Sequence, residues 1–233
     1  MTLILGILSR NGIIVRADGF SKQRSDKETK VTKRDLQKVF ASNEHPVALA
    51  HHGENVIRRT DIGELLQGWI DKELPKFYRD GLNATACALA TAFDSDVRRT
   101  LGTSKYRDSF GIWVSGWWPC TGIHDILEIY WKKHRPDRIR LHMNSFGDFV
   151  WGGNGLKYAK ATFERPSADP RFKTAYNATA DDNALLMDSW YQSCLDAQAA
   201  VSEDDFGGQW TEAKITKNRA EIGKGKRGVT HSI

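Results

Sequence analysis

Thr2 is the first residue of the chain whose position suggests chemistry. Small residues in second position generally permit removal of the start methionine, which would leave Thr2 with both a hydroxyl and a free α-amine. An α-amine has an ordinary pKa of about 7.7–8.0. Nearby positive charge lowers that pKa and makes the amine a base for the hydroxyl of its own residue. A lysine beside the threonine, held by a buried carboxylate, would supply such a charge.

Asp18 is the candidate carboxylate. Two apolar runs flank Asn11-Gly12, a pair typical of the central positions of a type I′ turn, and they predict an antiparallel hairpin. The second strand then brings Asp18 back near the level of Thr2. Because Ala-Asp-Gly is also a common turn sequence, the spacing alone leaves a capping role for this aspartate open.

The composition indicates a globular protein with one domain spanning residues 1–233. Hydrophobic residues make up 40% and charged residues 27% of the chain, and no linker rich in Pro, Gly or Ser divides it. No apolar run approaches the roughly 20 residues of a membrane helix, and no basic region precedes the first run as in a signal peptide. We therefore expect a cytoplasmic protein that does not enter membranes.

The cysteines and the basic tail point to no cofactor or nucleic acid. Cys87, Cys120 and Cys194 lack zinc-site spacing and are expected to be buried free thiols in a reducing compartment. No HExxH motif or phosphate-loop motif occurs, so no metal or cofactor is expected. The net charge is +5, and a basic tail begins at about residue 218. Without an RNA- or DNA-binding motif, we interpret this tail as a solvated, flexible terminus.

Hydrophobic periodicity predicts strands at both ends of the chain and helices between them. We expect a polar loop over residues 21–35 and a closing strand over 207–218. This order predicts an α+β protein whose sheets pack together inside, with helices outside. The other expected strands lie in 37–53, 109–118, 125–134 and 138–155, and the expected helices lie in 59–78, 84–101 and 181–201.

The first hairpin resembles the start of the proteasome β-subunit family, which includes the bacterial HslV-type peptidases. In that family a mature N-terminal threonine begins a strand and a catalytic aspartate closes the second strand, at the spacing of Thr2 and Asp18. The family's lysine before an apolar strand and glycine past its end match Lys38 and Gly53. Extra residues between Asp18 and Lys38 leave Lys33 as a rival for the lysine role.

The resemblance implies the four-layer αββα fold of N-terminal nucleophile hydrolases and a threonine-type endopeptidase. Thr2 would attack the peptide carbonyl, Lys38 held by Asp18 would lower the local pKa, and the Gly53 N–H would bind the oxyanion. The implied substrate is a peptide or unfolded protein. The implied partners are copies of the chain in a homo-oligomeric double ring and an ATP-dependent unfoldase. We expect subunit contacts through the apolar groups Trp69, Phe93, Trp117 and Trp190.

Three positions depart from the family pattern. Gly153 in a glycine-rich turn and Phe206 near the last strand stand where the family has serines, and Glu203 stands at the family's aspartate position. Because those groups orient the threonine amine, their replacement leaves two other functions open. One is an inactive structural or binding subunit, and the other is an amidase for small substrates. The candidate substitutes for the lost groups are Asn154, Ser202 and Asp204.

Two histidines form a further departure. His51 and His52 precede Gly53, where the family has small or apolar residues. They are interpreted either as additional acid–base groups or as residues of the surface or rim.

Overall fold

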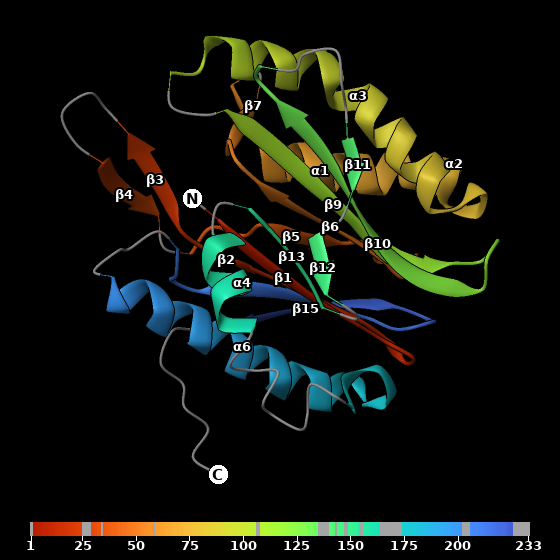
Figure 1. Ribbon diagram of the computed structural model, residues 1–233. Helices are drawn as coiled ribbons and strands as arrows, with labels where there is room; N and C mark the ends of the chain where they lie inside the picture. The colour runs from red at the N-terminus through yellow and green to blue at the C-terminus, as the bar shows by residue number, and fades with distance from the viewer. Residues whose placement is uncertain are drawn as a thin grey trace.

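The structure is a mixed α+β fold with two larger antiparallel sheets and, within the described residues, five α-helices (Figure 1). It is a computed structural model. The residues that it describes are 2–24, 29–33, 35–57, 59–105, 108–134, 140–142, 144–146, 149–153, 156–163, 174–201 and 206–225.

The six-stranded sheet has the order β12-β13-β1-β2-β14-β15, and the five-stranded sheet has the order β11-β10-β9-β6-β5. The strands of the first are β1 (Leu3–Ser9), β2 (Gly12–Asp18), β12 (Asn144–Phe146), β13 (Phe149–Gly153), β14 (Trp210–Ile215) and β15 (Ala220–Gly225). Those of the second are β5 (Val39–Ala41), β6 (Val47–His52), β9 (Ser109–Trp118), β10 (Ile123–Lys132) and β11 (Arg140–His142).

Short hairpins and helices complete the described chain. The hairpins pair β3 (Ser21–Arg24) with β4 (Thr29–Lys33) and β7 (Val56–Ile57) with β8 (Thr60–Asp61). The helices are α1 (Ile62–Lys72), α2 (Leu74–Phe77), α3 (Leu82–Thr103), α4 (Leu156–Phe163) and α6 (Ala180–Ala200), with short 3₁₀ turns η1 (Tyr78–Asp80) and η3 (Ala175–Asn177).

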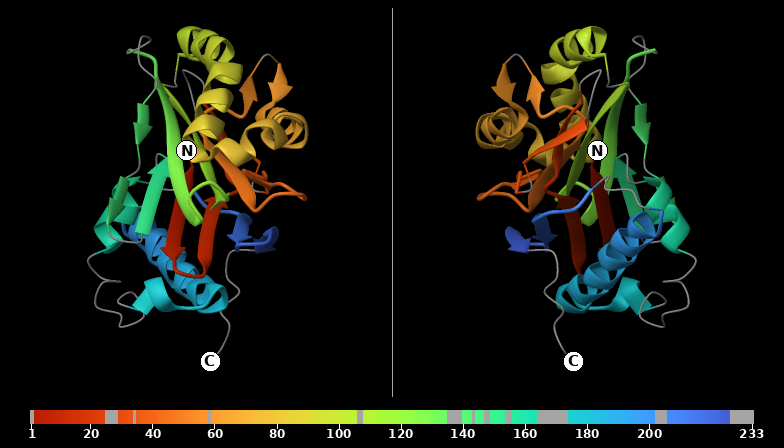
Figure 2. Two further views of the ribbon diagram at one scale, coloured as in Figure 1. Left: turned by 90° about the vertical axis from the view of Figure 1, so that its right-hand side faces the viewer. Right: turned by 90° about the vertical axis from the view of Figure 1, so that its left-hand side faces the viewer.

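Three clusters of buried apolar side chains hold these elements together. One lies between the five-stranded sheet and helices α1 and α3, and a second lies between β1, β13 and helices α4 and α6. The two helix groups lie on opposite sides of the molecule (Figures 1 and 2). The third cluster contains Ile4, Val15, Ala50 and Trp113, so it joins residues of both sheets. Strands β1 and β2 bury both faces, which explains their continuous apolar sequences.

The first hairpin forms as expected, but its turn lies one residue earlier than the sequence predicts. Ser9 pairs with Gly12, so Arg10 and Asn11 form the turn. Gly12 is instead a strand residue with φ 151°, and a Cβ there would lie 2.1 Å from the Ile215 carbonyl oxygen. Close approach of β14 therefore requires this glycine. The resulting register places Asp18 beside the first residues of β1.

Several expected elements differ from the observed ones. Residues 21–35 contain the β3–β4 hairpin rather than only a loop, and 138–155 contains three short strands. The predicted helix over 59–78 starts at Ile62 and ends at Lys72, because Pro75, the second residue of α2, lacks the N–H that a continuous helix needs. Strand β15 pairs with β14, so the tail expected to be flexible from about residue 218 contains a strand.

The exposure of several side chains also corrects the sequence interpretation. Trp69, Phe93 and Trp190 are buried within the chain's own cores, so they are not the exposed subunit contacts that we expected. Of the cysteines only Cys194 is buried, whereas Cys87 and Cys120 are exposed. None of the helices that the structure describes has the length and apolar character needed to cross a membrane.

Candidate functional site

Thr2 lies directly before β1, where strands of both sheets come close. Its exposed fraction is 3%. The next residue, Leu3, pairs with Gly153 of β13, and the neighbouring Ile4 pairs with Ala17 of β2. The two strands that flank β1 therefore fix the backbone that carries the Thr2 hydroxyl.

Lys38 brings a buried ammonium group to Thr2. Its Nζ atom donates to Thr2 Oγ1 over 2.8 Å, to the Phe20 carbonyl oxygen over 2.5 Å and to Asp18 Oδ1 over 3.5 Å. The Lys38 side chain is only 1% exposed. Three acceptors thus surround a buried cation, an arrangement that offsets the cost of removing it from water.

Asp18 is the fixed point of this group. Its side chain has no exposed surface, and Oδ1 accepts from the Leu3 N–H over 2.8 Å. Oδ2 accepts from the N–H groups of Phe20 and Gly207, over 3.1 and 3.2 Å. The carboxylate therefore ties together β1, the end of β2 and the segment before β14. The structure thus places the predicted Asp18 and Lys38 beside Thr2.

Both candidate glycines have backbone conformations that favour glycine, and Gly153 lies against the backbone of Thr2. Gly53 follows β6 with φ 104°, and a Cβ there would lie 2.8 Å from the Ser109 carbonyl oxygen. Gly153 ends β13 with φ 79°, and a Cβ there would lie 2.2 Å from the Thr2 carbonyl oxygen. In this conformation the backbone beside Thr2 leaves no room for the family's serine side chain at Gly153.

His51 and His52 are both buried, but their side chains have different neighbours, which the sequence does not reveal. His51 is 1% exposed, and its ring stacks with the rings of Phe40 and Phe110. Burial, with the charges of Lys38 and His52, holds the pKa of His51 well below its ordinary value. His51 is therefore neutral at physiological pH. His52 contacts the buried carboxylate of Glu128, as Nε2 and Oε1 are 2.6 Å apart.

Some predicted site residues lie outside the described part of the chain. They are Glu203 and the substitutes Asn154, Ser202 and Asp204. Lys33 is described only as a β4 residue that pairs with Ser21. The expected serine position at Phe206 holds a buried ring that packs near Tyr158 and Tyr191.

Sequence reasoning missed the backbone and carboxylate partners of the site. The Phe20 carbonyl and the Gly207 N–H carry no sequence signal, because any residue supplies them. Glu128 does carry a sequence signal, since it is an acidic residue inside the largely apolar stretch Ile126–Trp131. A charged residue amid such neighbours indicates a buried, partnered group.

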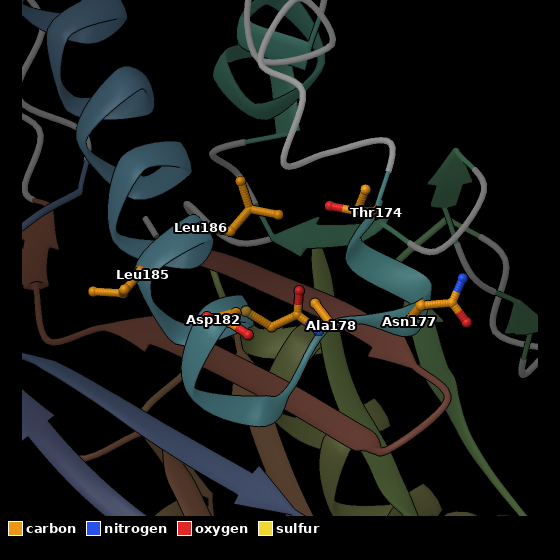
Figure 3. Close-up of a pocket in the computed structure, with 7 residues that line it drawn as sticks. Thr174, Asn177, Ala178, Asp182, Leu185 and Leu186 are labelled. Atoms are coloured by element: carbon orange, nitrogen blue, oxygen red, sulfur yellow. The ribbon is translucent and has the colours of Figure 1, made fainter.

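A cavity of about 290 Å³ lies elsewhere, at the start of α6 (Figure 3). One of its residues, Ala178, accepts from the side chain of Asn11 in the turn at the far end of β1 from Thr2. The cavity therefore does not belong to the Thr2 site. Among the residues that the structure describes, no cluster of three His, Cys, Asp or Glu is arranged to hold a metal ion.

No protein-family model matches the chain, and no curated protein matches it significantly. The geometry around Thr2 and the resemblance seen in the sequence are therefore the grounds for assigning a function.

The contact between Gly153 and Thr2 predicts the effect of a single methyl group. Gly153→Ala should destabilise the protein by more than the about 1–2 kcal/mol that a left-handed backbone costs a non-glycine residue, because the Thr2 carbonyl must also move. Denaturant unfolding measures this loss. Gly122→Ala is the matched control, since Gly122 has φ 68° but no atom within 4 Å of an added Cβ. Equal losses in the two variants would show that the carbonyl contact is unimportant.

Proposed function

We propose that the protein is a threonine-type endopeptidase of the proteasome β-subunit and HslV kind, with Thr2 as its N-terminal nucleophile. The observation that carries this proposal is the 2.8 Å contact between Lys38 Nζ and Thr2 Oγ1, with Asp18 bound to both the lysine and the first strand. A buried lysine aimed at a hydroxyl oxygen stabilises negative charge on that oxygen. The substrate class proposed is a peptide or an unfolded protein.

The proposed reaction uses the two functional groups of Thr2 once Met1 is removed. The α-amine takes the Oγ proton as Oγ attacks the peptide carbonyl carbon, and the Gly53 N–H binds the resulting oxyanion. The amine then passes its proton to the leaving nitrogen, which gives a Thr2 ester and a released peptide. Water, deprotonated by the same amine, hydrolyses the ester and restores Thr2.

The packing of the elements supports the fold that goes with this function. Helices α1 and α3 share a core with one sheet, α4 and α6 share a core with the other, and the third core joins the sheets. We propose that these contacts represent the four-layer αββα arrangement of N-terminal nucleophile hydrolases. Because glycine stands at position 153, where the family has a serine, an inactive subunit on the same fold is the alternative to be tested.

Thr2→Ala should abolish hydrolysis of fluorogenic peptides, because it removes the nucleophile but leaves the backbone of β1 in place. Thr2→Ser is the matched control and should retain activity, since it keeps a hydroxyl and an α-amine on one residue. Steady-state assays with circular dichroism as the folding check decide the matter. Unchanged turnover in Thr2→Ala would eliminate Thr2 as the nucleophile, and an inactive wild-type protein would favour the non-catalytic subunit.

Lys38→Ala should lower kcat by about 10²–10³, the range seen when an enzyme loses one group that stabilises transition-state charge. Lys33→Ala should change kcat little, because Lys38 supplies the ammonium beside Thr2. Both variants are compared with the wild type at saturating peptide. A damaging Lys33→Ala with a mild Lys38→Ala would reverse the assignment of the lysine.

We further propose assembly into a homo-oligomeric double ring of about 12–14 chains in total, a number that comes from the resemblance and is constrained by the need of a repeated heterologous contact to close. A peptidase with its nucleophile at a chain end needs such a compartment to spare folded proteins. Light scattering or native mass spectrometry measures the assembly. A stable monomer of 26.3 kDa at micromolar concentration would contradict the ring and favour a free-standing amidase or binding protein.

A further inference from the structure

Glu128 of β10 is a buried carboxylate outside the set of residues that the proposed reaction uses. It is 2% exposed, and its Oε1 lies 2.6 Å from His52 Nε2 and 3.2 Å from Trp113 Nε1. Indole nitrogen is a donor only, so Oε1 accepts from Trp113. In the tautomer that carries a proton on Nε2, His52 donates to the same oxygen. The three side chains form one hydrogen-bonded group contributed by β6, β9 and β10.

This group holds the residue that immediately precedes Gly53. The ladder between β6 and β9 ends at the pair His52 and Gly111. Gly53 is the first residue beyond it and has φ 104°. The direction of the Gly53 N–H therefore depends on how firmly the peptide unit that it shares with His52 is held, because that N–H belongs to the same peptide.

The space around the His52 ring leaves it little freedom. A Cβ at Gly111 would lie 2.1 Å from His52 Nε2 and 2.9 Å from Glu128 Oε1, so the ring lies directly against the Gly111 backbone. A Cβ at Gly153 would lie 3.5 Å from His52 Cβ and 2.2 Å from the Thr2 carbonyl oxygen. His52 thus lies close both to the β9 backbone at Gly111 and to the Gly153 backbone that contacts Thr2.

We infer that Glu128, acting through His52, is a positioning residue that orients the Gly53 N–H toward the oxyanion formed on attack by Thr2. This inference rests on the proposed peptidase function. The short contact of 2.6 Å between His52 Nε2 and Glu128 Oε1 holds the His52 side chain in place at the end of the β6–β9 ladder. The oxyanion donor requires such support, because small displacements of a donor reduce transition-state stabilisation.

The test measures kcat, KM and the affinity for a peptide aldehyde in Glu128→Leu, His52→Ala and Glu128→Gln. The aldehyde reports on the oxyanion donor, since addition of Thr2 Oγ to its carbonyl forms a C–O bond and places the former carbonyl oxygen at the oxyanion position. We expect Glu128→Leu and His52→Ala to lower kcat about 10–100-fold with KM nearly unchanged, and to weaken the aldehyde by the same factor. Glu128→Gln keeps a carbonyl oxygen that accepts two hydrogen bonds and should restore most of the activity.

Glu212→Leu is the matched control for general loss of stability. Glu212 is another buried carboxylate, 3% exposed, and accepts from Arg16 Nε and Nη2 over 2.9 and 2.6 Å. This pair bridges β2 and β14 and contacts α6 through Asp188. The Glu212→Leu substitution should lower the melting temperature without a comparable loss of kcat.

Two results would overturn the inference: a loss of kcat no larger than that in Glu212→Leu, or a lower kcat with unchanged aldehyde affinity. If Glu128→Leu does not fold, the measurements on His52→Ala test the inference, because that substitution removes side-chain atoms and adds none. A wild-type protein without peptidase activity would contradict the proposed function and this inference with it. An active wild type with unaffected Glu128→Leu and His52→Ala would contradict the inference alone.

Discussion

The buried contact of Lys38 with Asp18 and Thr2 is the interaction on which the arrangement of the site depends. An ammonium group removed from water costs several kcal/mol unless acceptors surround it, and Lys38 has the Asp18 carboxylate, the Phe20 carbonyl and the Thr2 hydroxyl around it. Asp18 in turn accepts backbone N–H groups from both ends of the first hairpin and from Gly207. Segments far apart in the chain are thus held at one point by charge and hydrogen bonding.

The two sheets make this interior group compatible with an apolar core. Ile4, Val15, Ala50 and Trp113 belong to one apolar cluster with residues from both sheets, while polar groups surround Thr2. There the chain uses glycine where backbones approach closely, as Gly153 does at the Thr2 carbonyl. Water is excluded from most of the group, and electrostatic interactions are stronger in such an environment.

The position of Asp18 was predictable from local sequence patterns. The contacts between residues far apart in the chain were not, because they depend on how the strands pair. Asp18 follows from hairpin periodicity, although the turn was placed one residue late because Gly12 serves the contact with β14 rather than the turn. Lys38 was expected only from the family resemblance, with Lys33 as a rival, since no local rule places a lysine beside a residue 36 positions away. The contact of His52 with Glu128 spans 76 positions and depends on the pairing of β6, β9 and β10. Such contacts are set by tertiary structure, which single-sequence patterns do not contain.

If Thr2 acts as nucleophile and base together, its α-amine must be free. The intact mass of the purified protein, with sequencing of its N-terminal peptide, shows whether Met1 has been removed. We expect a mass lower than that of the full 233-residue chain by one methionine residue, with Thr2 as the first residue. A protein that retains Met1 while it hydrolyses peptides at full rate would contradict this dual role of Thr2.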